Sequence, residues 1–410
     1  MKTLPLLKKS TLLLLLVASL GYFVDTFDLI LFVVIGKSSL AEMGYAGQTL
    51  DNMRLFLFDV QMVGLLLGGI FFGILGDKKG RLSVLFGSIL LYSVCNIING
   101  FINDIYSYTA LRFLAGVGLA GELGVGVTIV AETMPQKIRG YGTSILAATG
   151  VLGAVVAGLI GDSLYWRHAF FVGGGLGILL LLLRIGTFES EMFLHAKSDQ
   201  KHERGNILKL ITNPQSRKIY ILSLLVGIPV FFVVTILMQM APSLATELNI
   251  QGEITTGKAV ALIYTGLAMG DVLCGVVSQK LKSRKKAIGI FQVASLIISL
   301  IYLNLHDQSS AVFYFVCVLM GISTGYWIVM ITMGAEQFGT NIRATVATTI
   351  PNFVRGMAIP ISMLYGFLGS LSSLSIIQAA IITGITCFAI ALYANYKLPE
   401  TFHKDLDYLE

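Results

Sequence analysis

Long apolar runs, repeated along the whole chain, constrain this sequence more than any other feature. A helix crosses a bilayer with about 20 mostly apolar residues, and backbone groups in hydrocarbon are satisfied only within helices or closed barrels. Because each run has the length of a helix, we predict an all-α membrane protein with twelve transmembrane helices. The runs lie near residues 11–36, 55–76, 82–102, 105–131, 141–162, 167–187, 219–242, 257–279, 286–304, 310–335, 345–369 and 371–396.

Composition leaves little room for a soluble domain. Of the 410 residues, 55% are hydrophobic and only 13% are charged, against about 25% charged in typical soluble domains. This balance excludes nucleic-acid binders and enzymes that work on an extramembrane domain. The four cysteines lie inside apolar runs without CxxC spacing, and no GxSG or HExxH motif is present. We therefore expect no enzyme, no cofactor and no metal site.

The Lys and Arg residues are distributed unevenly between the two sides that twelve helices define. Most of the 29 lie on the side that holds both termini, whereas the other side has only Lys37, Arg54, Arg167 and Lys258. Loops rich in Lys and Arg stay in the cytoplasm. We predict a multi-pass protein of a bacterial inner (plasma) membrane, with both termini cytoplasmic.

The two halves of the chain carry related patterns. Three glycines of the second apolar run match three of the eighth, and a Glu followed by Ile-Arg recurs at nearly the same offset. We predict two six-helix bundles in parallel repeat, at 1–187 and 217–410, joined by a cytoplasmic linker at 188–216. The matched residues are Gly64, Gly68, Gly73, Glu132, Ile138 and Arg139 in the first half, and Gly266, Gly270, Gly275, Glu336, Ile342 and Arg343 in the second.

The segment GILGDKKGRLSVL at 73–85 resembles the loop between helices 2 and 3 of the major facilitator superfamily, with the pattern G-x-x-x-D-[RK]-x-G-R-[RK]. Leu82 replaces the last basic residue. The resemblance implies the major facilitator fold and transport by alternating access. It also implies a cytoplasmic gate, which we expect to contain Gly73, Asp77, Lys78, Gly80, Arg81, Glu132, Arg139, Glu336 and Arg343.

Further stretches resemble the signatures of the metabolite:proton symporters within that superfamily. Ala115, Ala169 and Glu191 depart from those signatures, and LPET at 398–401 is shared with the sugar porters. The resemblance implies proton-coupled symport by a monomer. The stretches are GYFVDTFDLILF at 21–32, RFLAGVGLAGELGVG at 112–126, AETMPQKIRG at 131–140, WRHAF at 166–170 and ESEMF at 189–193.

Four ionisable residues of the first half fall inside apolar runs, where each costs several kcal/mol and is a functional candidate. Asp25 and Asp28 are three residues apart, hence on one helix face, and Arg112 and Glu122 lie in the fourth run. We expect Arg112 to pair with one of these acids, while another, Asp28 or Glu122, binds and releases the coupled proton. The alternative is a structural salt bridge that orders the bundle.

In the second half, Arg355 and Asp271 fall at similar depths near the middle of their runs. A buried guanidinium suits a carboxylate, so we expect Arg355 to bind a substrate anion. The alternative is an ion pair between Arg355 and Asp271. We expect the walls of the binding cavity to be Tyr326, Trp327, Asn352 and Gln239. Asp271 also belongs to the expected substrate-binding residues.

These residues together predict a secondary active transporter. The leading hypothesis is proton-coupled symport of a small organic acid or zwitterionic metabolite, so the expected partners are a carboxylate-bearing small molecule, protons and the lipid bilayer, without nucleic acid. One alternative is a proton antiporter that exports a small organic molecule. Another is a membrane receptor without transport, which would leave the buried charges without a role.

Overall fold

The computed structural model describes residues 9–79, 81–120, 139–184, 213–338, 340–371 and 373–402, and nearly all of them are helical. The N-terminal helices are α1 (Lys9–Glu42), α2 (Gly47–Lys79), α3 (Arg81–Asn99), α4 (Ile105–Leu119), α6 (Arg139–Ser163) and α7 (Trp166–Arg184). The C-terminal helices are α10 (Pro214–Leu225), α11 (Ile228–Phe232), the π-helical turn η1 (Val233–Met238), α12 (Ala241–Glu247), α13 (Thr256–Leu281), α14 (Arg284–Tyr302), α15 (Ser310–Thr324), α16 (Trp327–Glu336), α17 (Thr340–Gly356), α18 (Ala358–Gly369) and α19 (Ile376–Lys397).

The helices have the length and surface of membrane spans. Within the described ranges, eight helical stretches are long and apolar enough to cross a bilayer. Large apolar side chains such as Phe71, Val272 and Met363 are more than half exposed on the outside of the bundle, which suits lipid and not water. The prediction of an all-α membrane protein is confirmed.

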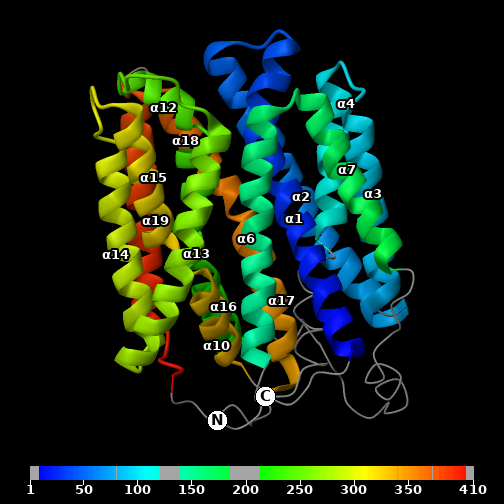
Figure 1. Cartoon of the computed structure of the whole chain (residues 1–410). Helices are drawn as coiled ribbons and strands as arrows, with labels where there is room; N and C mark the ends of the chain where they lie inside the picture. The colour runs from blue at the N-terminus through cyan, green and yellow to red at the C-terminus, as the bar shows by residue number, and fades with distance from the viewer. Residues whose placement is uncertain are drawn as a thin grey trace.

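The N-terminal helices and the C-terminal helices form two groups that meet along a central seam (Figure 1). In the first group α1 packs along α6, and in the second α13 packs along α15. Across the seam α6 packs against α13, and α2 packs against α17 and α18. We call the end of the bundle where α1 ends and α2 begins the distal end, and the opposite end the terminal end.

Two of the three glycine pairs matched between the halves, Gly64 with Gly266 and Gly68 with Gly270, have the same packing role. A Cβ atom on Gly64 would lie 2.1 Å from the carbonyl oxygen of Phe113, and one on Gly266 would lie 2.2 Å from that of Val318. Each glycine thus lets its helix touch a neighbouring backbone, α2 against α4 and α13 against α15. The recurrence in the sequence therefore reflects a recurrent close helix contact.

The distal end is closed by contacts between the two helix groups. Gly158 of α6 and Gly257 of α13 approach so closely that a Cβ on Gly158 would lie 2.6 Å from the carbonyl oxygen of Gly257. Asp162 then accepts from the backbone N–H groups of Gly257 at 3.0 Å and Lys258 at 2.8 Å, and from the Thr255 hydroxyl. A carboxylate of one group therefore caps the first turn of a helix of the other.

Three of the predicted spans are interrupted, which corrects the expectation of continuous helices at 219–242, 310–335 and 345–369. Within the described residues, the breaks fall at 226–227 and 239–240 in the first of these spans, at 325–326 in the second and at Met357 in the third. At 325–326, a Cβ on Gly325 would lie 2.5 Å from the backbone nitrogen of Asp271, so the chain needs glycine there. Pro351 stays inside α17, and Pro360 lies in the first turn of α18, where proline is tolerated.

The helix α10 begins at Pro214, inside the predicted linker 188–216. Asn213 caps this helix, because its side chain accepts from the backbone of Gln215 at 2.9 Å and Ser216 at 3.4 Å. The rest of the predicted linker lies outside the described residues.

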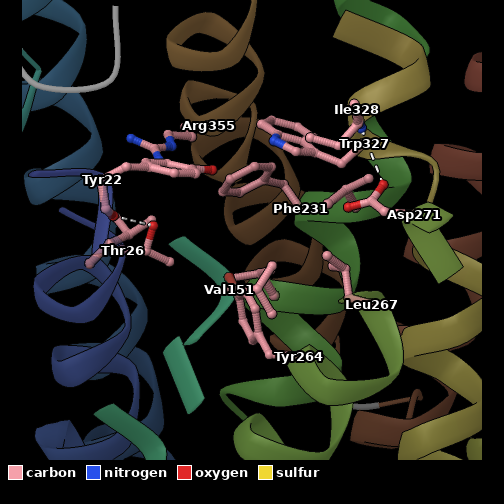
Figure 2. Close-up of a pocket in the computed structure, with 13 residues that line it drawn as sticks. Tyr22, Thr26, Val151, Phe231, Tyr264, Leu267, Asp271, Trp327, Ile328 and Arg355 are labelled. Atoms are coloured by element: carbon pink, nitrogen blue, oxygen red, sulfur yellow. Dashed lines mark hydrogen bonds between the residues drawn. The ribbon is translucent and has the colours of Figure 1, made fainter. Parts of the chain in front are cut away.

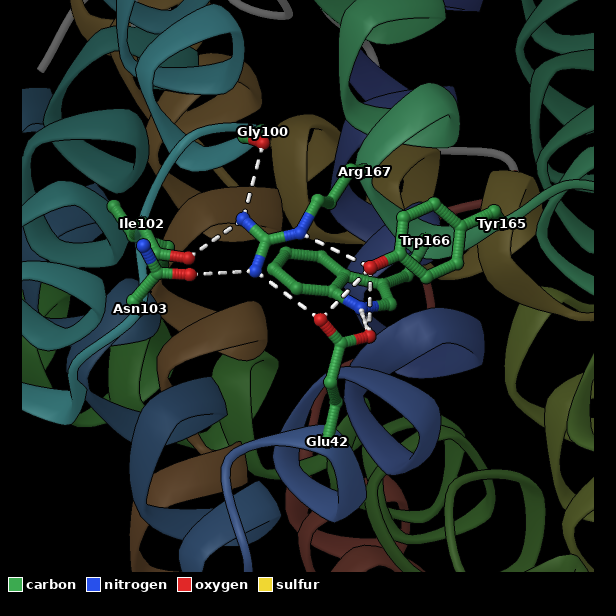
Figure 3. A network of polar contacts seen from close by, with 7 residues as sticks. All are labelled: Glu42, Gly100, Ile102, Asn103, Tyr165, Trp166 and Arg167. Atoms are coloured by element: carbon green, nitrogen blue, oxygen red, sulfur yellow. Dashed lines mark hydrogen bonds and ion pairs between the residues drawn. The ribbon is translucent and has the colours of Figure 1, made fainter.

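The WRHAF stretch forms a clamp at the distal end of the N-terminal helices (Figure 3). Glu42, at the end of α1, accepts from Tyr165 Oη at 2.8 Å and Trp166 Nε1 at 2.7 Å, and pairs with Arg167 Nη2 at 3.2 Å. Arg167 also donates to the carbonyl oxygen of Ile102 at 2.7 Å. The motif therefore ties α1 and α7 to the loop before α4.

Candidate functional site

A cavity lies on the seam between the two helix groups (Figure 2). The helices α1 and α6 contribute one wall, and α11, η1, α13, α16 and α17 contribute the other. The helix break at 325–326 directly precedes the lining residues Trp327 and Ile328, so this interruption helps to shape the cavity. The lining residues are Tyr22, Thr26, Leu29, Val151, Val230, Phe231, Val234, Tyr264, Leu267, Asp271, Trp327, Ile328 and Arg355.

Aromatic rings make up much of the lining. Phe231 and Trp327 contact each other with ring centroids 6.1 Å apart, and Tyr22 and Tyr264 contribute two further rings from α1 and α13. Flat apolar walls of this kind favour a planar or unsaturated organic molecule.

An ion pair crosses the seam at one end of the cavity. Arg355 Nη2 of α17 lies 3.0 Å from Asp25 Oδ2 of α1, and the two side chains are 4% and 0% exposed. Within the described part of the chain, Arg355 Nη1 and Asp25 Oδ1 are buried without a hydrogen-bond partner. The pair is thus formed by one contact only, and both groups keep hydrogen-bonding capacity for a ligand or a proton.

The alternative pair between Arg355 and Asp271 is not formed. Asp271 Oδ1 instead accepts from the backbone N–H of Ile328 at 3.2 Å, and the carboxyl lies at the other end of the cavity from the guanidinium (Figure 2). The break before α16 leaves free N–H groups at the start of that helix, and a carboxylate is stabilised there. Asp271 therefore has a partner of its own in the C-terminal helices.

A second buried cluster lies within the N-terminal helices. Asn96 of α3 donates to Asp28 Oδ1 and accepts from Arg112 Nη2 at 2.7 Å. The guanidinium carbon of Arg112 also lies 4.9 Å from the centre of the Phe170 ring. The expected direct pair between Arg112 and an acid is wrong for Asp28, because the Asn96 amide lies between the two charged groups, and for Asp25, because it pairs with Arg355.

Removing the Asn96 amide should destabilise the protein. We expect Asn96→Ala to lower the free energy of unfolding by about 1–3 kcal/mol, because it strands Asp28 and Arg112 without their shared partner. The measurement is the thermal unfolding midpoint in detergent. Asn99→Ala is the matched control, since Asn99 is also fully buried on α3 but its side-chain atoms make no hydrogen bond to other described residues. An equal loss in both variants would contradict the bridging role.

The predicted binding residues divide into two sets. Arg355, Asp271 and Trp327 line the cavity, whereas Tyr326, Asn352 and Gln239 do not. The last three therefore stay predictions as substrate contacts, since they do not border this cavity. The Tyr326 hydroxyl donates to the carbonyl oxygen of Val226 at 3.3 Å, inside the C-terminal helices. The Gln239 carbonyl oxygen accepts from Arg54 at the distal closure, at 2.7 Å.

Sequence reasoning found Trp327 but missed the aromatic lining residues Tyr22, Phe231 and Tyr264, and it missed the bridging Asn96. Asn96 carried a signal, because an amide inside an apolar run needs partners. Tyr22, Phe231 and Tyr264 carried none, since aromatic residues are common in membrane helices and only the fold shows which of them meet. Among the residues that the structure describes, no three His, Cys, Asp or Glu side chains lie together as metal ligands.

Most of the predicted gate lies outside the described residues. The gate residues Gly80 and Glu132 and the proton candidate Glu122 are not described. The side chains of Asp77, Lys78, Arg81, Arg139 and Arg343, and the surroundings of Gly73, are not described either. Glu336 is described: it pairs with Arg284 Nη2 at 3.3 Å and accepts from the Thr401 hydroxyl at 2.6 Å.

Two residues of the LPET stretch, Glu400 and Thr401, join the end of the chain to the start of α14 and to Glu336. Glu400 accepts from the Ser283 hydroxyl and from the backbone nitrogen of Arg284 at 2.9 Å. Partial burial raises the pKa of Glu400, but these hydrogen bonds and those from the backbone of Phe402 and Thr401 outweigh it and hold the pKa below its ordinary value. The carboxylate therefore caps α14 and fixes the end of α19 beside it.

The family model of the Major Facilitator Superfamily matches residues 14–363. The chain belongs to this superfamily. The transporter has the superfamily's twelve-helix fold, it is not an enzyme, and it is a multi-pass integral membrane protein. It is similar to the 3-(3-hydroxy-phenyl)propionate transporter of Escherichia coli, with 26% identity over 72% of this chain and 73% of the relative. It is also similar to the cis,cis-muconate transport protein of Acinetobacter baylyi, with 26% identity over 96% and 94%.

A solved structure shares the fold of this transporter. The inward open conformation of the xylose transporter XylE from E. coli aligns with a TM-score of 0.75 and 17% identity, covering 97% of this chain and 98% of that one. At this identity the likeness concerns the fold.

Proposed function

We propose that this transporter carries out proton-coupled symport of a small organic acid or zwitterionic metabolite by alternating access, as a monomer in a bacterial inner membrane. Both termini and the terminal end of the bundle face the cytoplasm, because most Lys and Arg residues lie on that side. The observation that carries the proposal is the buried Arg355–Asp25 pair, whose arginine lines a cavity between the two helix groups.

Charge balance links the carboxylate to the proton. The Arg355–Asp25 pair is neutral, so a carboxylate that enters the buried cavity and binds Arg355 would leave one uncompensated negative charge. A charge without a partner at this depth costs several kcal/mol. Protonation of Asp25 removes the excess charge and frees the guanidinium. One carboxylate group thus brings in one proton.

The far end of the cavity selects the rest of the substrate. Asp271 uses one oxygen for the α16 backbone and lies opposite Arg355 across the aromatic rings (Figure 2). A hydroxyl or ammonium group of the substrate can donate to this carboxyl. The substrate is therefore a flat or unsaturated acid with a donor at the end remote from its carboxylate. The names of both relatives support an unsaturated or aromatic organic acid, and that of the 3-(3-hydroxy-phenyl)propionate transporter also supports the remote donor.

A paired-probe experiment tests the proposal. Proteoliposomes that contain the transporter should show counterflow of radiolabelled 3-(3-hydroxyphenyl)propionate above the level of protein-free liposomes. An inward-directed proton gradient should raise uptake, and a protonophore should abolish the increase. If neither the proton gradient nor the protonophore changes uptake, the protein is a uniporter.

The matched probe 3-phenylpropionate lacks the hydroxyl that would donate a hydrogen bond to Asp271. We expect it to compete about tenfold less well, because a missing partner leaves a buried polar group unpaired at a cost of about 1–3 kcal/mol. Asp271→Ala should reduce this preference. A preference that survives unchanged in Asp271→Ala would remove Asp271 from the binding site.

A further inference from the structure

A line of polar contacts joins α2 to the C-terminal helices at the distal end. Asp51 accepts from the Ser243 hydroxyl at 2.6 Å, and Arg54 donates to the Gln239 carbonyl oxygen. Two turns deeper in α2, Asp59 contacts the Ser362 hydroxyl of α18. Because α2 and α18 belong to different helix groups, these contacts exist only while the distal end is closed.

The Asp59–Ser362 contact requires one more hydrogen than the serine has. Ser362 Oγ lies 2.9 Å from the carbonyl oxygen of Ile359 and in hydrogen-bond contact with Asp59 Oδ2. A hydroxyl has a single hydrogen to donate but can also accept. Both contacts are satisfied together when Ser362 donates to Ile359 and a protonated Asp59 carboxyl donates to Ser362.

The surroundings of Asp59 also suit a neutral carboxyl. Its Oδ1 atom is buried without a hydrogen-bond partner among the described residues, and no ion pair joins it to a described cation. An ionised carboxylate at such a site is costly. Among the residues whose side chains the structure describes, the titratable groups of the elements that pack against α2 are Tyr22, Asp25, Asp28, Lys37 and Glu42 of α1, Tyr92 and Cys95 of α3, Tyr106, Tyr108 and Arg112 of α4, Arg355 of α17 and Tyr365 of α18, with Asp51 and Arg54 on α2 itself.

The other two carboxyls of the distal closure need no proton. The Ser243 hydroxyl makes no other described hydrogen bond and can donate to ionised Asp51. Asp162 accepts from two backbone N–H groups and one hydroxyl, and in each of these contacts the hydrogen belongs to the donor. Asp59 is therefore the carboxyl of this closure whose contacts depend on protonation.

We propose that Asp59 is a second proton-binding site, whose protonation is required for the distal end to close. This rests on the alternating access of the proposed function. Asp59 takes its proton from the distal side and releases it to the same side when α2 and α18 separate. Protonation of Asp59 therefore allows the distal end to close, but this proton does not cross the membrane. Transport stoichiometry is then set by Asp25 alone.

The expected signature is a linked titration. If closure requires one bound proton, the ratio of closed to open molecules follows the fraction of open molecules in which Asp59 is protonated. This ratio falls up to tenfold for each pH unit above the pH range in which Asp59 titrates in the open state. Asparagine in its place can donate to Ser362 without titrating, so Asp59→Asn should stay closed at every pH.

The experiment measures a distance across the distal end by pulsed electron paramagnetic resonance between pH 5 and 9, in lipid nanodiscs without substrate. Tyr106→Cys and Glu253→Cys carry the labels, because both positions are exposed at the distal end and the four native cysteines are buried. We expect a pH-dependent loss of the short distance in the labelled parent and none in Asp59→Asn.

Two further variants complete the test. Asp51→Asn is the matched control on the same helix, and it should keep the pH dependence of the parent. Asp59→Ser supplies a second neutral replacement, which should also remove it if asparagine does not fold. A parent without pH dependence, or an Asp59→Asn variant with the parent's dependence, would overturn the proposal. Because no substrate is present, neither result depends on whether transport is coupled to protons.

Discussion

Replacing Asp25 by asparagine is expected to abolish uphill accumulation while exchange of substrate across the membrane continues. The amide keeps the shape of the side chain but cannot release a proton, so binding to Arg355 no longer depends on pH. In the wild type, a gradient of one pH unit should drive about tenfold accumulation of a monocarboxylate that moves with one proton. The variant should only equilibrate the probe, which uptake and counterflow in proteoliposomes measure.

Asp28→Asn is the matched control, one turn away on the same helix. Asp28 contacts Asn96 inside the N-terminal helices, whereas Asp25 pairs with the cavity-lining Arg355. We expect this variant to keep proton-driven accumulation. The opposite pattern, with coupling lost in Asp28→Asn and kept in Asp25→Asn, would return the proton to Asp28.

The second large effect is expected at Arg355. Arg355→Lys should weaken substrate binding about tenfold to 150-fold although the charge is kept, because an ammonium cannot present the planar donors that a carboxylate and Asp25 share. This range corresponds to the loss of a charge-assisted hydrogen bond of about 1.5–3 kcal/mol. Affinity is measured by competition in the counterflow assay.

A double variant separates binding from folding at this position. Arg355→Ala should lower the free energy of unfolding by about 3–5 kcal/mol, because it leaves Asp25 buried without a partner. Asp25→Asn in the same chain should restore much of the stability but not the affinity, whereas Asp271→Asn should restore neither. Full affinity in the well-folded Arg355→Ala and Asp25→Asn double variant would remove Arg355 from the site.

The sequence identifies which residues matter here more reliably than which residues meet. Asp25, Asp28, Arg112, Asp271 and Arg355 could all be predicted as special, because a charge inside an apolar run is expensive whatever the fold. Their partners could not. Arg355 meets Asp25 from 330 positions away in the chain, and helix periodicity carries no information about that distance.

The helix break at 325–326 explains why Tyr326 does not line the cavity. Continuous helices were expected through 310–335, but Gly325 ends α15 and brings the start of α16 to Asp271. Tyr326 therefore turns toward the Val226 carbonyl oxygen and away from the cavity. A glycine in a membrane helix usually marks close packing, so the sequence could not distinguish the break at Gly325 from the uninterrupted contact at Gly266.

Proton uptake on substrate binding tests the central claim most directly. The purified transporter, in lightly buffered detergent solution, is mixed with saturating 3-(3-hydroxyphenyl)propionate, and the pH change is read with an indicator dye. The account predicts that wild type takes up about one proton for each molecule bound and that Asp25→Asn binds the same molecule without taking up a proton. Binding without proton uptake in wild type, or equal uptake in both proteins, would contradict it.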